Sequence, residues 1–237
     1  MDALPTMLST PLYTVAEAAR LIGTPKTTLG AWARGYDYTT RHGSRRHSDP
    51  LVTEAGPGRR HYPTVPFVGL AEAAFLAAIR RTGVPMQRIR PALDRLRDEL
   101  GIEHALASRG IYTDGAEILY KVGRDTGIDV SALDELVVVR NNQGVFTEVI
   151  LDYLQHVTFG SSGYAEVIRL PRFGSADVIV DPRFSFGQPV LEASGVAIEA
   201  VLDRFDAGES IGDLAIDFEV APEVIEQLLR ASRQVAA

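Results

Sequence analysis

The chain has 237 residues, 46% of them hydrophobic and 23% charged, a balance typical of a folded globular protein. It contains no cysteine, which excludes disulfides, thiolate metal sites and a cysteine nucleophile. The first residues show no signal-peptide pattern, and the apolar stretch around Phe75 is too short and too charged to span a membrane. We therefore expect a cytoplasmic protein that does not enter a membrane.

The charge is divided unevenly along the chain. The net charge is −7, but residues 1–97 carry 14 basic and 7 acidic residues, while residues 98–237 carry 10 basic and 24 acidic ones. All but one of the 14 cations in the first part are arginines, whose planar guanidinium binds phosphate through several donors. This division predicts a basic part that contacts a polyanion and an acidic part with a different partner.

The N-terminal region begins with a short predicted helix. Thr14 and Glu17 have the spacing of a capping box, and the apolar residues that follow repeat at helical intervals. Gly23 is expected to end this helix, because glycine adopts the left-handed conformation found just after helix ends.

A second short helix is expected to start immediately afterwards, with Thr24 as its N-cap and Pro25 in its first position. Leu29 and Trp32 have the spacing of its buried face. Two short helices joined by a tight turn form a helix-turn-helix, whose second helix begins in the DNA major groove. The side chains expected at that groove are Lys26, Thr27 and Thr28.

Residues 36–63 are polar and rich in glycine, proline, arginine and histidine, which favours a loop or hairpin wing beside the helix-turn-helix. Two helices are predicted next, over residues 64–82 and 85–100, with Gly83 between them. Arg45 and Arg46 are candidate DNA-binding residues of this wing, which also contains Arg59, Arg60 and Tyr62.

Residues 13–97 resemble the DNA-binding domain of the MerR family. The matching segments are YTVAEAARLIGTPKTTLGAWARG, GRRHY and LAEAAFLAAIRRTGVPMQRIRPAL. The resemblance implies that Lys26, Thr27, Thr28 and Arg34 lie at the groove, and that the GRRHY segment meets backbone phosphates. The stretch before GRRHY is longer than in typical members, and the long dimerisation helix and metal-sensing cysteines of the family are missing, so a metal-responsive activator is not expected.

The rest of the chain is expected to contain a small mixed sheet within residues 101–177, and a three-helix, helix-turn-helix-like module within residues 178–237. Within the middle part we predict a helix over 146–154 and paired strands around the turn at 160–163. The predicted class is α+β, mainly helical. Its expected domains are 1–100 for DNA binding, 101–177 as an α/β linker subdomain, and 178–237 for interaction.

The segment from 178 to 231 resembles a small bacterial domain of unknown function that is common in VapB-type antitoxins. The two resemblances together imply an antitoxin that binds the operator of its own operon as a homodimer and neutralises a PIN-like ribonuclease toxin. The C-terminal module carries 4 basic and 11 acidic residues, which favours a protein partner over DNA. The aromatic residues expected to anchor that partner are Phe184, Phe186 and Phe205.

Other functions remain as alternatives. The chain could be a stand-alone MerR-like regulator that senses a small molecule, or its C-terminal module could be a second DNA reader. We expect no enzymatic activity, no cofactor and no metal, because no nucleophile–base pattern is visible. His42, His47 and His61 lie near Asp49 in the sequence, but their spacing matches no metal motif and five arginines flank them. His104 and His156 are interpreted as structural.

Overall fold

A computed structural model describes residues 5–39, 43–56, 62–84, 86–113, 115–116, 137–140 and 143–233. The chain forms two compact units, one of residues 1–155 and 159–165, and one of residues 156–158 and 166–237. Elements of the first unit are α1 (Thr6–Ser9), β1 (Pro11–Tyr13), α2 (Val15–Leu21), α3 (Lys26–Arg34), β2 (Tyr36–Thr39), β3 (Arg45–Ser48), β4 (Val65–Pro66), α4 (Phe67–Arg81), α5 (Met86–Leu100), η1 (Ala105–Ala107), α6 (Arg109–Thr113), β5 (Val137–Arg140), β6 (Gln143–Phe146) and α9 (Glu148–Gln155).

Helix α4 forms the centre of the first unit. Every residue from Phe67 to Ile79 is buried, so this helix is covered on all sides by other elements. Helix α9 packs against it, where the rings of Phe75 and Tyr153 lie 6.3 Å apart and the Tyr153 hydroxyl donates to the carbonyl of Ala71 over 3.3 Å. The two basic residues of α4, Arg80 and Arg81, lie in its exposed last turn, so the buried turns before them form the core.

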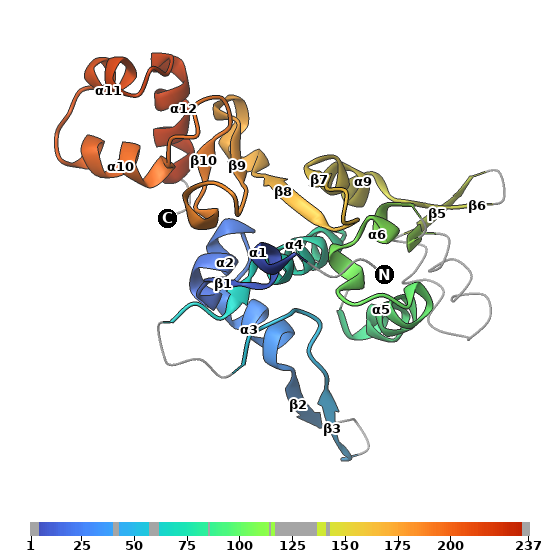
Figure 1. Cartoon of the computed structure of the whole chain (residues 1–237). Helices are drawn as coiled ribbons and strands as arrows, with labels where there is room; N and C mark the ends of the chain where they lie inside the picture. Colours follow the sequence, from blue (N-terminus) through green and yellow to red (C-terminus); the bar gives the residue numbers. More distant parts are fainter. Residues whose placement is uncertain are drawn as a thin grey trace. The chain divides into compact units, whose positions relative to one another are not determined.

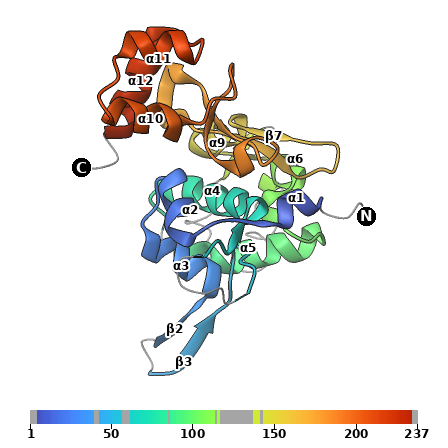
Figure 2. The same cartoon turned by 60° about the vertical axis from the view of Figure 1, so that its left-hand side comes forward.

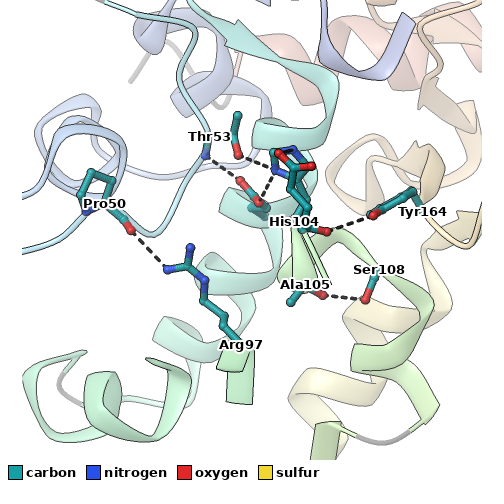
Figure 3. A network of polar contacts seen from close by, with 9 residues as sticks. Pro50, Thr53, Arg97, His104, Ala105, Ser108 and Tyr164 are labelled. Atoms are coloured by element: carbon teal, nitrogen blue, oxygen red, sulfur yellow. Dashed lines mark hydrogen bonds and ion pairs between the residues drawn. The ribbon is translucent and has the colours of Figure 1, made fainter. Parts of the chain in front are cut away.

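A buried carboxylate on α4 anchors two loops of the first unit (Figure 3). Glu72 accepts a hydrogen bond of 2.6 Å from the backbone N–H of Thr53, and its other oxygen lies 3.3 Å from Nδ1 of His104. The same imidazole nitrogen lies 2.8 Å from the Thr53 hydroxyl. The Tyr164 hydroxyl donates to the carbonyl of Glu103 beside it over 3.0 Å. A charge that interrupts the apolar pattern in the sequence is therefore satisfied by partners brought in from distant segments.

The second unit combines a small sheet with three helices. Its elements are β7 (Val157–Phe159), β8 (Ala165–Arg169), η2 (Pro171–Ala176), β9 (Val178–Val180), η3 (Ser185–Gly187), β10 (Val190–Leu191), α10 (Ile198–Asp206), α11 (Ile211–Asp217) and α12 (Pro222–Arg233). The sheet has the order β10-β9-β8-β7. Helices α10, α11 and α12 pack together, as Figure 1 shows, and α12 also packs on η2. The core of this helical group contains Val201, Leu214, Ile225 and Leu228.

The architecture confirms the expected combination of helices and small sheets, but it differs from the sequence prediction in three places. The residues expected to form a central subdomain are shared between both units, since β8 pairs with β9 through Ile168 and Val180. The strand pairs whose register the described residues define are all antiparallel, where a mixed sheet was expected. The helix expected over 146–154 begins two residues later, because Phe146 belongs to strand β6.

Candidate nucleic-acid interface

Helices α2 and α3 form the helix-turn-helix predicted from the sequence. The capping box is present, because the Thr14 hydroxyl accepts from the Glu17 N–H over 3.2 Å and the Glu17 carboxylate accepts from the Thr14 N–H over 2.7 Å. Gly23 adopts φ = +67° in the turn. The second helix begins one residue later than expected, at Lys26, with Pro25 in the cap position and no side-chain cap. Proline fixes its own φ, and its carbonyl accepts the first helical hydrogen bonds from Thr28 and Leu29.

The two faces of α3 have different surroundings. Leu29 and Trp32 are buried, as the sequence predicts, and hold this helix against the core. Lys26 and Thr27 are exposed at its first turn. Thr28 is half-buried, and its hydroxyl accepts a hydrogen bond of 2.8 Å from Nη1 of Arg80 at the end of α4. The first turn of α3 therefore carries an ammonium group and two hydroxyls, and the Arg80 guanidinium of α4 lies beside the Thr28 hydroxyl.

A two-stranded hairpin follows α3 directly and extends away from it in both views (Figures 1 and 2). Strands β2 and β3 pair antiparallel, with Tyr38 opposite Arg46 and Asp37 opposite His47. Side chains alternate between the two faces of a strand, so Arg45 and Arg46 lie on opposite faces of the hairpin. Asp37 contacts Arg45 at 3.6 Å and His47 at 2.8 Å, which leaves one face partly neutralised.

The base of this hairpin is fixed by contacts to the core. Gly35 precedes β2 with φ = +69°, and a Cβ at this position would lie 2.2 Å from the carbonyl oxygen of Ser48. The Trp32 carbonyl accepts hydrogen bonds from the backbone N–H groups of Leu51 and Val52, at 2.8 and 3.1 Å. Together with the bond from Thr53 to Glu72, these contacts hold both ends of the hairpin against α3 and α4.

The remaining predicted DNA-contact residues have different surroundings. Arg34 forms an ion pair of 2.8 Å with the largely buried Glu54, so its guanidinium is already held by a carboxylate. Tyr62 is 61% exposed. Arg59 and Arg60 lie outside the described residues. The structure thus places Lys26, Thr27 and Thr28 in the first turn of α3 and exposes Arg45 and Arg46 on the hairpin that follows this helix, while Arg34 in its last turn is paired with Glu54.

Sequence reasoning missed one cation of this surface, Arg80. Its place in the last turn of a long apolar helix was the available signal, since the helix dipole favours basic residues near the C-terminal end. The contact with Thr28 was not visible, because the two residues are 52 positions apart.

The second unit presents two aromatic side chains to solvent. Phe184 is 50% exposed and Phe186 is 85% exposed, in the turn between β9 and β10. Ser185 and Phe186 have φ of +45° and +53°, a left-handed conformation that costs energy for residues with a side chain. The loop is fixed at Asp181, which is buried and accepts hydrogen bonds from the backbone N–H and the guanidinium of Arg183. Phe205 is half-buried, with the Arg233 guanidinium 5.7 Å from its ring centre.

The part of the chain that the structure describes contains no group of three His, Asp or Glu side chains placed to hold a metal ion. His47 instead pairs with Asp37, and His42 and His61 fall outside the described residues. Among the same described residues, no helix is sufficiently long and apolar to cross a membrane.

Two family models match the chain. Residues 11–93 match a family described as "Putative DNA-binding HTH domain", which covers α2, α3, the hairpin and α4. Residues 178–230 match "Protein of unknown function (DUF433)", which covers β9 to α12.

Proteins of Mycobacterium tuberculosis (strain ATCC 25618 / H37Rv) resemble the whole chain. The protein named "Putative antitoxin VapB45" is 42% identical over 224 residues, which is 93% of each chain. The uncharacterized protein Rv2308 is 27% identical over 240 residues, 98% of this chain and 96% of that protein. The X-ray structure of Rv2018 matches with a TM-score of 0.80 and 40% identity, covering 93% of this chain and 98% of that one. The chain therefore belongs to the VapB-type antitoxin family, with an N-terminal helix-turn-helix DNA-binding domain and a C-terminal DUF433 domain.

Proposed function

We propose that this protein is an antitoxin that binds the operator of its own operon as a homodimer and neutralises a PIN-like ribonuclease toxin. The operator would be bound by the first unit in a MerR-like manner, through the start of α3 and the adjoining wing. The observation that carries this proposal is the hairpin that directly follows α3 and exposes Arg45 and Arg46, together with the exposed Lys26 and Thr27 in the first turn of that helix.

Each group on this surface suits a different part of a DNA duplex. Lys26 and the hairpin arginines supply cations for phosphates, a contact that gives affinity without sequence information. Thr27 and Thr28 have short hydroxyl side chains at the start of the helix, where contacts reach base edges in the major groove. One short helix reads few base pairs, so a two-fold operator calls for two copies of the chain.

The acidic second unit suits a different partner. It carries 6 basic and 13 acidic residues, so it repels nucleic acid and attracts a protein with a cationic RNA-binding cleft. Phe184 and Phe186 would anchor that protein, because exposed aromatic residues that enter a partner's pocket supply much of the binding energy. The strained backbone at Phe186 supports this role, since strain at an exposed position stabilises nothing in the isolated chain.

The test uses the full-length chain with two reagents. The first is a duplex carrying the sequence upstream of its own coding region, with a shuffled duplex of equal composition as the control. The second is the ribonuclease encoded beside it, assayed on labelled RNA. The proposal expects tighter binding to the upstream duplex and loss of RNA cleavage on mixing. Equal affinity for both duplexes would contradict specific binding to the operator. Undiminished RNA cleavage would contradict neutralisation of the ribonuclease.

A further inference from the structure

A cavity of about 520 Å³ lies in the first unit between the first turns of α3, strand β2, the end of α4 and the start of α5. Its walls include Thr27 and Thr28 from α3, Tyr36 from β2, Arg80 from α4 and Arg90 from α5. This volume is in the range of pockets that hold small organic molecules.

The charged side chains among the described lining residues of this cavity are all positive. Two guanidinium groups and two threonine hydroxyls line it, and the described residues along its wall include no Asp or Glu. A second cavity in the same unit shows the contrast, because Glu54, Glu72, Asp94 and Asp98 are among its lining residues. The cavity beside α3 is therefore the one suited to a negatively charged ligand.

The state of Arg90 points to such a ligand. Its Nη2 atom is buried, and the described residues offer it no hydrogen-bond acceptor. Asp94 on the same helix interacts with the charge of this guanidinium, but a buried N–H group without an acceptor is still costly, and a ligand oxygen supplies the missing partner. Arg80 differs, because it is exposed and already donates to the Thr28 hydroxyl at the rim.

The remaining lining residues indicate the chemistry of the rest of the ligand. Trp32, Val84 and Met86 are apolar, and Tyr36 adds a second aromatic side chain. We propose that this cavity binds a small organic anion, with a phosphate or carboxylate group between Arg90 and Arg80 and an apolar or aromatic body against Trp32 and Tyr36. A guanidinium pairs with either group through two parallel hydrogen bonds.

The site borders the surface assigned to DNA. A ligand on Arg80 and Thr28 occupies groups that would otherwise face the duplex, so it competes with DNA. This coupling rests on the proposed function, whereas the binding itself does not. A duplex phosphate is the other source of a similar anion, but the buried end of Arg90 favours a small free molecule over the backbone of a duplex.

Trp32 makes the binding measurable without DNA, because it is the single tryptophan of the chain and lies on the cavity wall. Phenyl phosphate is the probe, with inorganic phosphate and uncharged benzyl alcohol for comparison. We expect a saturable change in tryptophan fluorescence with phenyl phosphate, a weaker response to inorganic phosphate and none to benzyl alcohol. The absence of saturation with phenyl phosphate, or an equal response to benzyl alcohol, would overturn the proposal.

Two pairs of variants of the full-length chain locate the effect. Arg90→Met should weaken phenyl phosphate binding at least tenfold, while Arg95→Met on the same helix, exposed and outside the cavity, leaves it unchanged. Arg80→Met and its neighbour Arg81→Met form a second pair with both residues exposed, which keeps the test valid if Arg90→Met does not fold. Equal binding within both pairs would contradict the site.

A final experiment tests the competition by adding phenyl phosphate to the chain bound to the upstream duplex. Phenyl phosphate should release bound duplex from the wild-type chain and fail to do so with Arg90→Met. If instead a short duplex alone reproduces the tryptophan response and Arg90→Met abolishes both, the anion is a DNA phosphate and the proposal of a free ligand is wrong.

Discussion

The carboxylate of Glu72, in the middle of the buried helix α4, lies 3.3 Å from the imidazole Nδ1 of His104, which is 32 positions further along the chain. The hydrogen bond to Glu72 raises the pKa of His104 above its usual value, and the nearby Glu103 acts in the same direction. Burial and Arg97 oppose this shift in pKa. The pair therefore links α4 to the segment that leads into α6, and Thr53 joins the loop that follows the hairpin to both of its members.

The raised pKa of His104 predicts how stability depends on pH. A histidine whose pKa is higher in the folded than in the unfolded state stabilises the fold fully below its unfolded pKa of about 6.5. That contribution is lost as the pH rises through the higher folded pKa. The difference in melting temperature between the wild-type chain and His104→Gln should thus be larger at acidic than at alkaline pH.

The control for this prediction is His47→Gln, which removes an exposed imidazole from the hairpin. Melting curves are measured by circular dichroism between pH 5 and 9. This interval includes the range of about pH 5–8 in which histidine side chains titrate. A destabilisation by His104→Gln that stays constant across this range would show that its proton does not matter to folding.

The position of the hairpin depends on Gly35. Gly35→Ala forces a side chain into a left-handed conformation and places its Cβ against the carbonyl of Ser48. Gly43→Ala is the matched variant, because Gly43 has φ = +79° but open space around its Cβ position. The conformational cost alone is about 1–2 kcal/mol, so Gly43→Ala should lose about that much stability and Gly35→Ala more.

Urea denaturation measures both variants, and fluorescence anisotropy with the upstream duplex gives the functional consequence. We expect Gly35→Ala to bind the duplex more weakly, because the base of the hairpin moves. Equal losses of stability in the two variants would show that the contact with Ser48 is relieved at no cost.

Much of the helix-turn-helix could be predicted from local sequence, and the reason is physical. The capping box of Thr14 and Glu17 and the spacing of Leu29 and Trp32 are local signals, and both are confirmed. Helix α3 begins one residue later than predicted, because a proline with its fixed φ can occupy either the N-cap or the first helical position. Local rules place an element reliably and its terminal residue less so.

The features that were not predicted depend on long-range contacts. His104 was interpreted as structural, which agrees with its bonds to Glu72 and Thr53, but neither partner was foreseen. The pairing of Ile168 with Val180 placed the sheet across the expected boundary at residue 177, because short strands carry little information about their neighbours. The cavity beside α3 needed Arg80 and Arg90 from two further helices, and no local pattern connects these residues.

The exposed aromatic loop predicts that partner binding and stability can be separated. Phe186→Gly removes a side chain that is 85% exposed and places glycine at a position with φ = +53°. Inhibition of the ribonuclease should weaken about tenfold or more, as for an anchor residue of an interface. The unfolding midpoint in urea should not fall, because glycine accepts this conformation without strain.

Glycine at position 216 would destabilise helix α11 by about 1 kcal/mol relative to alanine, so the matched control is Ile216→Ala, which removes another exposed apolar side chain of the second unit. This variant should inhibit the ribonuclease as the wild-type chain does. Full inhibition by Phe186→Gly, or an equal loss with Ile216→Ala, would move the toxin contact away from the loop between β9 and β10.

The division of labour between the two units is tested most directly by the salt dependence of DNA binding. The logarithm of the binding constant falls with the logarithm of salt concentration, with a slope of about −0.9 per neutralised phosphate. Anisotropy titrations with the upstream duplex should give a slope flatter by about one to two units for the double variant Arg45→Ala and Arg46→Ala. The double variant Arg230→Ala and Arg233→Ala removes the same charge from α12 and should keep the wild-type slope. The same slope for all three proteins, or a flatter slope only for the α12 variant, would contradict DNA binding by the first unit.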